Sequence, residues 1–312
     1  MKTFCVVNPA SSGGCTGRLW PRILRQLEQA IGPVQSELTT RNFAAVAITQ
    51  RALQAGYDRI IAVGGDGTVS EVAIGFQLDR APINREAVLG FLMAGTGSDL
   101  GRTFRIETGI VAQLARLASG RTREIDLGRV NCVDEHGNPN ERLFINIASF
   151  GLSGAVALRV NRATFSKVLG GRLSFRWNSA LATFGYRNLP ARLRVDDAFD
   201  DIVDVSTVAV ANGQYFGGGM WVAPKADPAD GLFDVVIMRG VSRTELLREL
   251  GKIYAGKHLD NPKVTVVRGK KITAEPVAHP GVEAVLLEVD GESPGRLPAS
   301  FEILPQAIRV AC

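Results

Sequence analysis

The sequence lacks the patterns that mark disulfide-stapled, zinc-binding and membrane-spanning proteins. Its four cysteines are scattered, with no CxxC pair, so we expect reduced thiols and no zinc site. Its three histidines lie far apart, and no two have the i, i+4 spacing of a helical metal pair. No run approaches the roughly 18–20 apolar residues that a membrane-spanning helix needs, and the first residues show no signal-peptide pattern. We therefore expect a cytoplasmic protein.

Acidic residues are missing from one long segment. Between Leu143 and Val195 there is no Asp or Glu, although the net charge of the whole chain is only +5. The basic residues of this segment are Arg159, Arg162, Lys167, Arg172, Arg176, Arg187, Arg192 and Arg194. Such an asymmetry indicates an anionic partner. The alternative is a solvated surface on which some of these arginines pair with distant acids.

The first part of the chain alternates short apolar runs with longer amphipathic ones. Strands are predicted at 3–7, 34–39, 59–63 and 88–93, and helices at 19–31, 43–55 and 69–77. Strands separated by helices imply parallel βαβ crossovers and an α/β domain of Rossmann-like, three-layer type. Ligands of such domains bind at the carboxyl ends of the strands.

After about Asp126 the pattern changes to short runs with β character, which predicts an antiparallel β domain. The runs are 143–147, 203–210, 233–237, 264–267, 270–274 and 284–289. The basic segment interrupts them near 156–184, with apolar residues at helical spacing around a Gly170-Gly171 break. We expect an α/β domain over 1–126 and a β-sandwich domain over 127–299. The final strand, 300–312, either finishes the second domain or returns to the first.

Three loops follow predicted strands of the first domain and have the composition of phosphate cradles. The first is Asn8–Gly14, whose small residues let backbone N–H groups approach an anion. The third is Ala94-Gly95-Thr96-Gly97-Ser98-Asp99, and Thr96 in it can hydrogen-bond a phosphate. Asp99 is a second metal-site carboxylate or the N-cap of a short helix. Because these strands are parallel, the loops should lie at one edge of the sheet.

The second loop, Gly64-Gly65-Asp66-Gly67-Thr68, carries the strongest signal. It follows the apolar strand 60–63 and precedes a helix that contains Glu71. Glycines on both sides of Asp66 should permit a turn that side chains would block and bring backbone donors to a triphosphate. Asp66 would then sit where Mg²⁺ bridges phosphate oxygens. A turn or capping role for Asp66 is the alternative.

These loops, together with Asp230–Asp234 and Val289–Glu292, resemble the bacterial soluble diacylglycerol kinase and lipid kinase family, which is related to sphingosine and ceramide kinases. The resemblance runs nearly end to end and in the same order. It implies a nucleotide-binding α/β domain, a β-sandwich domain for the lipid, and transfer of the ATP γ-phosphoryl group to a lipid hydroxyl.

The resemblance also implies roles for single residues. Nucleotide contacts fall on Asn8, Thr40, Gly65 through Glu71, and Thr96. A structural magnesium site falls on Asp227, Asp230 and the backbone of Leu232, a stretch that otherwise reads as a polar turn. Glu292 matches the proposed general base; by sequence alone it is also compatible with a solvated residue at an Asp-Gly hairpin turn. Ser98 stands where the family usually has Asn.

Three functions follow as hypotheses. The first is an ATP- and Mg²⁺-dependent lipid kinase that uses Asp66, Asp99 and Glu292 and docks on the inner face of the membrane through the basic segment 159–194. The second is a phosphotransferase with a soluble acceptor, as in NAD kinases, which share a GGDGT loop. The third is a nucleotide-sensing protein that binds lipid or nucleic acid without catalysis. We expect no nucleic acid partner, and a homodimer is left open.

Overall fold

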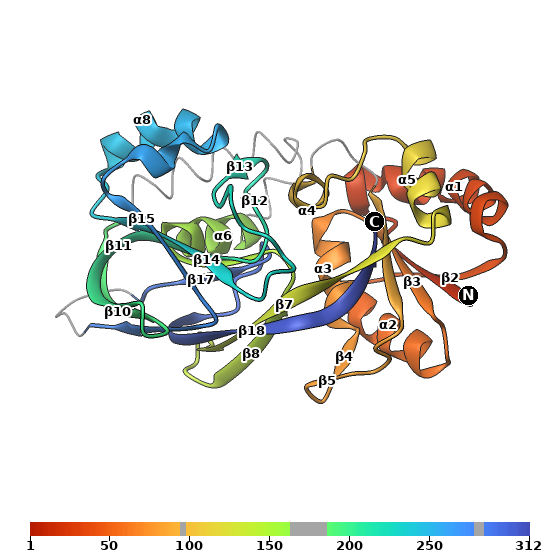
Figure 1. Ribbon diagram of the computed structural model, residues 1–312, viewed down its shortest axis with the longest axis horizontal. Coiled ribbons are helices and arrows are strands. Elements are labelled where there is room, and N and C mark those ends of the chain that lie inside the picture. The colour runs from red at the N-terminus through yellow and green to blue at the C-terminus, as the bar shows by residue number, and fades with distance from the viewer. Residues whose placement is uncertain (94–97, 163–185, 278–283) are drawn as a thin grey trace. The chain divides into compact units, whose positions relative to one another are not determined.

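The computed structural model describes residues 1–93, 98–162, 186–277 and 284–312 (Figure 1). The chain forms two compact units, one of Met1–Leu127 with Pro305–Cys312 and one of Gly128–Leu304. Within the described ranges, no helix is both long enough and apolar enough to cross a membrane.

Unit 1 is built on a parallel sheet. Its strands β1 (Thr3–Val7), β2 (Val34–Leu38), β3 (Arg59–Gly64) and β6 (Val88–Met93) lie in the order β2-β1-β3-β6. The connections carry α1 (Cys15–Ile31), α2 (Ala44–Gln54) and α3 (Asp66–Ile74), and α4 (Asp99–Thr103) and α5 (Ile110–Ala118) come after β6. This is the α/β arrangement that the alternating pattern predicts.

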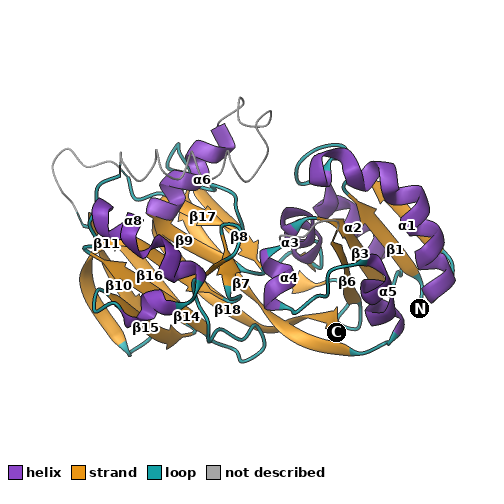
Figure 2. Cartoon of the chain, turned by 90° about the horizontal axis from the view of Figure 1, so that it is seen from above, coloured by secondary structure: helices purple, strands orange, loops and turns teal. Residues whose placement is uncertain are grey.

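The core of unit 1 explains why its helices are amphipathic. Trp20 and Leu27 of α1 and Leu114 and Leu117 of α5 are buried against the apolar side chains of β1 and β3. Figure 2 shows α1 and α5 together on one side of these strands. Burial of such large side chains stabilises by roughly 1.5–3 kcal/mol each.

Unit 2 is an antiparallel β-sandwich. Its strands are β7 (Thr122–Val133), β8 (Pro139–Phe144), β9 (Ile147–Gly151), β10 (Leu189–Val195), β11 (Phe199–Ala211), β12 (Tyr215–Phe216), β13 (Met220–Trp221), β14 (Phe233–Arg239), β15 (Val264–Gly269), β16 (Lys271–Pro276), β17 (Leu287–Val289) and β18 (Arg296–Ala311). The helices α6 (Leu152–Arg162) and α8 (Arg243–Tyr254) flank them. Phe144, Phe150, Phe233 and Phe301 form stacked pairs in its core.

The first and last strands of unit 2 extend beyond it. In β18, residues Ala299–Glu302 pair with β16, whereas Arg309 and Val310 pair in parallel with β6 of unit 1. In β7, residues 122–127 belong to unit 1 and the remainder to unit 2.

One predicted strand of the second domain is wrong. Residues Leu143–Ile147 do not form a continuous strand, because β8 ends at Phe144 and β9 begins at Ile147. The backbone N–H groups of Ile145, Asn146 and Ile147 all donate to the carboxylate of Asp290, at 2.9–3.1 Å. A distant carboxylate therefore breaks the ladder at this point.

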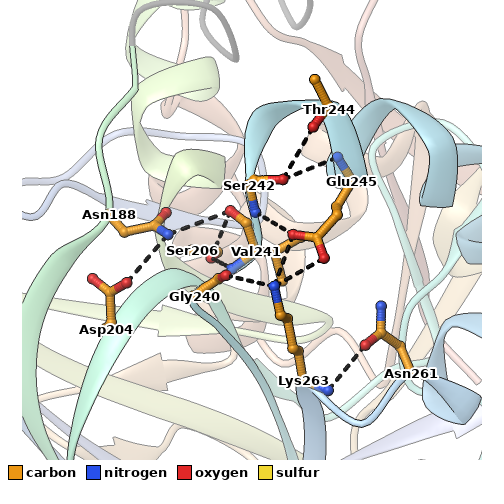
Figure 3. Close-up of polar contacts among 10 residues, drawn as sticks. All are labelled: Asn188, Asp204, Ser206, Gly240, Val241, Ser242, Thr244, Glu245, Asn261 and Lys263. Carbon is orange, nitrogen blue, oxygen red and sulfur yellow. Dashed lines mark hydrogen bonds and ion pairs between the residues drawn. The ribbon is translucent and has the colours of Figure 1, made fainter.

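The start of α8 is fixed by a polar network (Figure 3). Ser242 and Glu245 form a reciprocal capping box, which satisfies backbone donors at the helix start. Both carboxylate oxygens of Glu245 accept from Lys263 Nζ, at 2.8 and 2.9 Å, and the same ammonium donates to the carbonyl oxygen of Gly240. The Ser206 hydroxyl oxygen accepts from the N–H of Val241 at 2.8 Å.

This network predicts an acid-sensitive contribution to stability. Hydrogen bonds from Lys263, and then from Ser242, hold the pKa of Glu245 down to about 2, from an ordinary value of 4.5. The stability that the Glu245 carboxylate contributes is therefore complete at pH values above its ordinary pKa of 4.5, and it is lost as the pH falls toward about 2. In urea unfolding near neutral pH, the Glu245→Gln variant should have a lower free energy of unfolding than wild type. This difference should become smaller as the pH falls through the acid range. Lys263→Met should show the same narrowing, and a pH-independent deficit in either variant would contradict this account.

Candidate functional site

The three predicted loops of unit 1 follow strands that end at the same edge of its sheet. The strands β1 and β3 pair in parallel with Val7 opposite Val63, and β3 pairs with β6 with Gly64 opposite Met93. The side-chain amide of Asn8 donates to Thr68 Oγ1 at 3.1 Å, so the first and second loops are in contact. The expectation that they share one edge is confirmed for these two.

Asp66 joins the second loop to the third. It is the first residue of α3, and its carboxylate accepts hydrogen bonds from the Ser98 hydroxyl and from the backbone N–H groups of Asp99 and Leu100. The last two distances are 2.9 and 3.2 Å. The side chain is half-exposed. A carboxylate between two helix N-termini is electrostatically stabilised, because both ends carry partial positive charge.

The structure settles one of the two roles proposed for Asp99. The N-cap of α4 is Ser98, whose hydroxyl oxygen accepts from the N–H of Gly101 at 2.7 Å, so Asp99 is not the N-cap. The buried Asp99 carboxylate instead forms an ion pair of 2.9 Å with Arg102. Ser98, which stands where Asn is usual in the family, thus caps α4 and binds Asp66 with one hydroxyl group.

The expectation that side chains at Gly65 and Gly67 would block the turn of the second loop is wrong. Gly65 has an extended backbone, with φ −101°, and Gly67 lies inside α3, so the backbone conformation requires glycine at neither position. A Cβ atom on either residue would meet no atom of the chain within 4 Å. A Cβ on Gly64, in contrast, would come within 2.5 Å of Thr68 Oγ1. Gly64 is thus required by packing, whereas open space lies over Gly65 and Gly67.

This difference gives a paired prediction. Gly64→Ala should lower the free energy of unfolding by about 1–3 kcal/mol, because the added methyl displaces the buried Thr68. Gly67→Ala should leave stability unchanged or slightly raised, since alanine favours a helix. If a phosphate approaches Gly67, the same variant loses nucleotide affinity. Denaturant unfolding and nucleotide titration separate the two effects, and an unchanged stability of Gly64→Ala would contradict the packing argument.

The other predicted nucleotide contacts of unit 1 lie in different environments, and two of them are outside the described residues. Glu71 lies on α3, and its carboxylate accepts from the backbone N–H of Ala45 at 3.2 Å, at the start of α2. Thr40 is exposed after the end of β2. Gly95 and Thr96 lie outside the described residues. Glu71 therefore has a structural role in addition to the one the resemblance implies.

Glu292 lies in unit 2, at the end of a tight hairpin turn. Val289 and Glu292 exchange two backbone hydrogen bonds of 2.9 Å across Asp290 and Gly291, which have φ values of 47° and 92°. Positive φ at both central residues is the type I′ geometry that an Asp-Gly pair favours. The Glu292 side chain is exposed.

Two carboxylates that our sequence reasoning assigned no role hold this turn. The Asp290 carboxylate accepts from the three backbone N–H groups at Ile145–Ile147. The backbone N–H of Asp290 also donates to the Ile147 carbonyl oxygen, at 3.0 Å. Glu288 is buried and accepts from the N–H of Gly291 at 2.6 Å and from the hydroxyl of Ser149. The only signal in the sequence is the placement of acids two and four residues before Glu292.

The stretch proposed for structural magnesium is a turn just before β14. Asp227 Oδ1 accepts from the N–H of Ala229 at 3.2 Å, and Asp230 Oδ1 accepts from the N–H of Leu232 at 3.1 Å. The other oxygen of Asp230 forms an ion pair with the guanidinium of Arg268. The positive charge of the Arg268 guanidinium on Asp230 opposes a divalent cation on the same carboxylate.

A magnesium ion brought by a nucleotide fits unit 1 better. Among the residues that the structure describes, no group of three or more His, Cys, Asp or Glu side chains forms a metal cage. Nucleotide-bound Mg²⁺ needs only one or two carboxylates in addition to phosphate oxygens and water. Among the described residues, Asp66 Oδ2 accepts one hydrogen bond, from the N–H of Asp99, and a carboxylate oxygen has two lone pairs. Asp66 is therefore a suitable ligand.

The basic segment is only partly available to an anionic partner. Arg192 and Arg194 of β10 pair with Asp200 across the hairpin, at 2.9 and 3.2 Å. The two arginines share the single carboxylate of Asp200, so their positive charge is only partly neutralised. Arg159 and Arg187 are exposed. The side chains of Arg162, Lys167, Arg172 and Arg176, and the predicted helical spacing from Phe165 onward, lie outside the described residues.

An α/β unit with a Gly-rich strand-to-helix turn, followed by an antiparallel β-sandwich, is the two-domain arrangement that the resemblance implies, and comparison with known proteins agrees. The model of the diacylglycerol kinase catalytic domain matches residues 2–130, and the model of the YegS C-terminal NAD kinase beta sandwich-like domain matches residues 146–312. A diacylglycerol kinase of Mycobacterium tuberculosis is 31% identical over 83% of this chain and 78% of its own. A diacylglycerol kinase of Staphylococcus carnosus is 28% identical, and the match covers 98% of this chain and 93% of that protein.

A solved structure shares the fold. The crystal structure of a putative diacylglycerol kinase from Bacillus anthracis has a TM-score of 0.76 at 21% identity, and the match covers 99% of this chain and 94% of that one. The chain belongs to the diacylglycerol kinase family, and it is a lipid kinase of that family.

Proposed function

We propose that this protein transfers the γ-phosphoryl group of ATP to the hydroxyl of a diacylglycerol-like lipid in a Mg²⁺-dependent reaction. The observation that carries the proposal is the meeting of Asn8, Thr68 and Asp66 with the start of α4 at one edge of the unit 1 sheet. The curated relatives are named for diacylglycerol, which supports this acceptor.

The residues of unit 1 have distinct roles in this proposal. The N-terminus of α3 and the open space over Gly65 and Gly67 receive the phosphates, because orphan backbone N–H groups and the helix dipole favour anions there. Asp66 is the ligand of the Mg²⁺ ion, which neutralises charge on the transferred group when bound. Asp99, held by Arg102, is the second carboxylate at this edge. Asn8, Thr40, Glu71, Gly95 and Thr96 complete the proposed nucleotide contacts.

Glu292 is the proposed general base. A lipid hydroxyl is a poor nucleophile, and a carboxylate within hydrogen-bond reach takes its proton as the new P–O bond forms. The turn that carries Glu292 is held by Asp290 and Glu288, so its backbone is well fixed while its side chain is exposed to an incoming substrate.

An NAD-kinase-like reaction is the second candidate, because the family model that matches unit 2 is described as NAD kinase beta sandwich-like. Purified protein should be supplied with γ-labelled ATP, MgCl₂ and either diacylglycerol in mixed micelles or NAD. Our proposal predicts label in the lipid phase and none in NAD. Label in NAD alone would favour the soluble acceptor. Turnover of neither, with ATP binding retained, would favour a non-catalytic nucleotide-sensing protein.

We further propose that the enzyme docks on an anionic membrane surface, as an acceptor dissolved in a bilayer requires. The exposed arginines Arg159 and Arg187 support this, and each basic residue near such a surface contributes about 1 kcal/mol. Co-sedimentation with phosphatidylglycerol vesicles should exceed that with phosphatidylcholine vesicles and fall with added salt. Equal binding to both vesicle types would contradict docking by charge.

A further inference from the structure

The turn Asp227–Leu232 is connected to two strands by a single side chain. Arg268 lies on β15 directly opposite Asp234 of β14, in the antiparallel register of these strands. Its guanidinium forms an ion pair with Asp230, on the turn, and a second one of 3.4 Å with Asp234 Oδ2, on the strand. One cation therefore joins the turn to the sheet.

Asp234 shows why a cation is needed here. Its side chain is only 3% exposed, and the Arg268 guanidinium lies 3.4 Å from its Oδ2 atom. A buried carboxylate without a compensating charge is costly. Asp230 carries a second negative charge on the same guanidinium, so the two carboxylates require a positive partner between them.

We propose that in this protein the Arg268 guanidinium takes the place of a divalent cation at the Asp227–Leu232 turn. A guanidinium presents several N–H donors in a planar fork, which suits two carboxylates on adjacent elements. It is permanently charged and covalently part of the fold, so unit 2 keeps this turn without bound metal. A guanidinium and Mg²⁺ cannot both be seated on Asp230 without strong repulsion, so they are alternatives.

The test is a thermal-unfolding measurement on the full-length, nucleotide-free protein, in EDTA and in millimolar MgCl₂. Wild type should show the same melting temperature in both conditions. Arg268→Gln should melt lower in EDTA and recover in MgCl₂ by on the order of 2–4 °C, because removal of the guanidinium frees both carboxylates for the cation. The Mg²⁺-dependent recovery should vanish in Arg268→Gln combined with Asp230→Asn.

Arg239→Gln is the matched control, because Arg239 is at the other end of β14 and pairs with Asp201 at 3.3 Å. Its melting temperature should not respond to MgCl₂. A wild type that loses stability in EDTA, in a manner abolished by Asp230→Asn, would overturn the proposal by showing that the metal binds with Arg268 present. An Arg268→Gln variant with no Mg²⁺ response would overturn it as well, since the two cations would then not be interchangeable.

Discussion

Glu292→Gln is expected to lower kcat for lipid phosphorylation by roughly 10²–10⁴-fold, the usual contribution of a general base. Glutamine keeps the size of the side chain and cannot accept the proton of the lipid hydroxyl. Because the Glu292 side chain is exposed, the melting temperature should not change. The KM for ATP should also stay close to the wild-type value, because the loss falls on proton transfer rather than on nucleotide binding.

Glu275→Gln is the matched control for this variant, since Glu275 is another exposed glutamate of unit 2, on β16. It should retain wild-type kinetics. A Glu292→Gln enzyme with full kcat would remove Glu292 from the mechanism, whereas a loss confined to the KM for the lipid would assign it to substrate binding.

Asp66→Asn is expected to lower kcat/KM by on the order of 10²-fold or more, because it removes the negative charge that holds the nucleotide-bound metal. The asparagine side chain retains one oxygen for the N-terminus of α4, so part of the structural role survives. The rate should be measured across a MgCl₂ titration, in which the variant needs a higher concentration for half-maximal activity.

Ser98→Ala separates the structural role of Asp66 from its proposed role in metal binding. It removes the hydroxyl that caps α4 and donates to Asp66, and it leaves the carboxylate in place. Loss of an N-cap costs about 1 kcal/mol of stability. If Ser98→Ala lowered activity as much as Asp66→Asn does, Asp66 would act by holding α4 rather than by binding metal.

Much of the fold follows from local patterns, and the differences have physical causes. The strands at 3–7 and 88–93 are mostly apolar runs, and the structure has them with the same bounds. The helix predicted from Val69 begins earlier, at Asp66. The sequence pattern misses this first turn because Asp, Gly and Thr have low helix propensity and resemble a loop. Amphipathic α5 and α8 were not predicted, although Ser242 and Glu245 form a capping-box signature.

The candidate site is predictable where parallel strands dictate it. Contact of Asn8 with Thr68 follows from adjacent strands that end at one edge, a property of βαβ topology. The hydrogen bonds of Asp290 to Ile145–Ile147 span more than 140 residues of sequence, and no local pattern encodes them. The pairing of Asp230 with Arg268 depends in the same way on the register between β14 and β15.

The central claim is that this protein moves the γ-phosphoryl group of ATP onto a lipid hydroxyl. The most direct measurement incubates the wild-type protein with a bacterial lipid extract and MgCl₂, in parallel with γ-labelled and α-labelled ATP, and follows the label that partitions into the organic phase. Our account predicts label in the organic phase from γ-labelled ATP only, and its loss with Asp66→Asn and with Glu292→Gln. No organic-phase label from γ-labelled ATP, or equal label from both nucleotides, would contradict it.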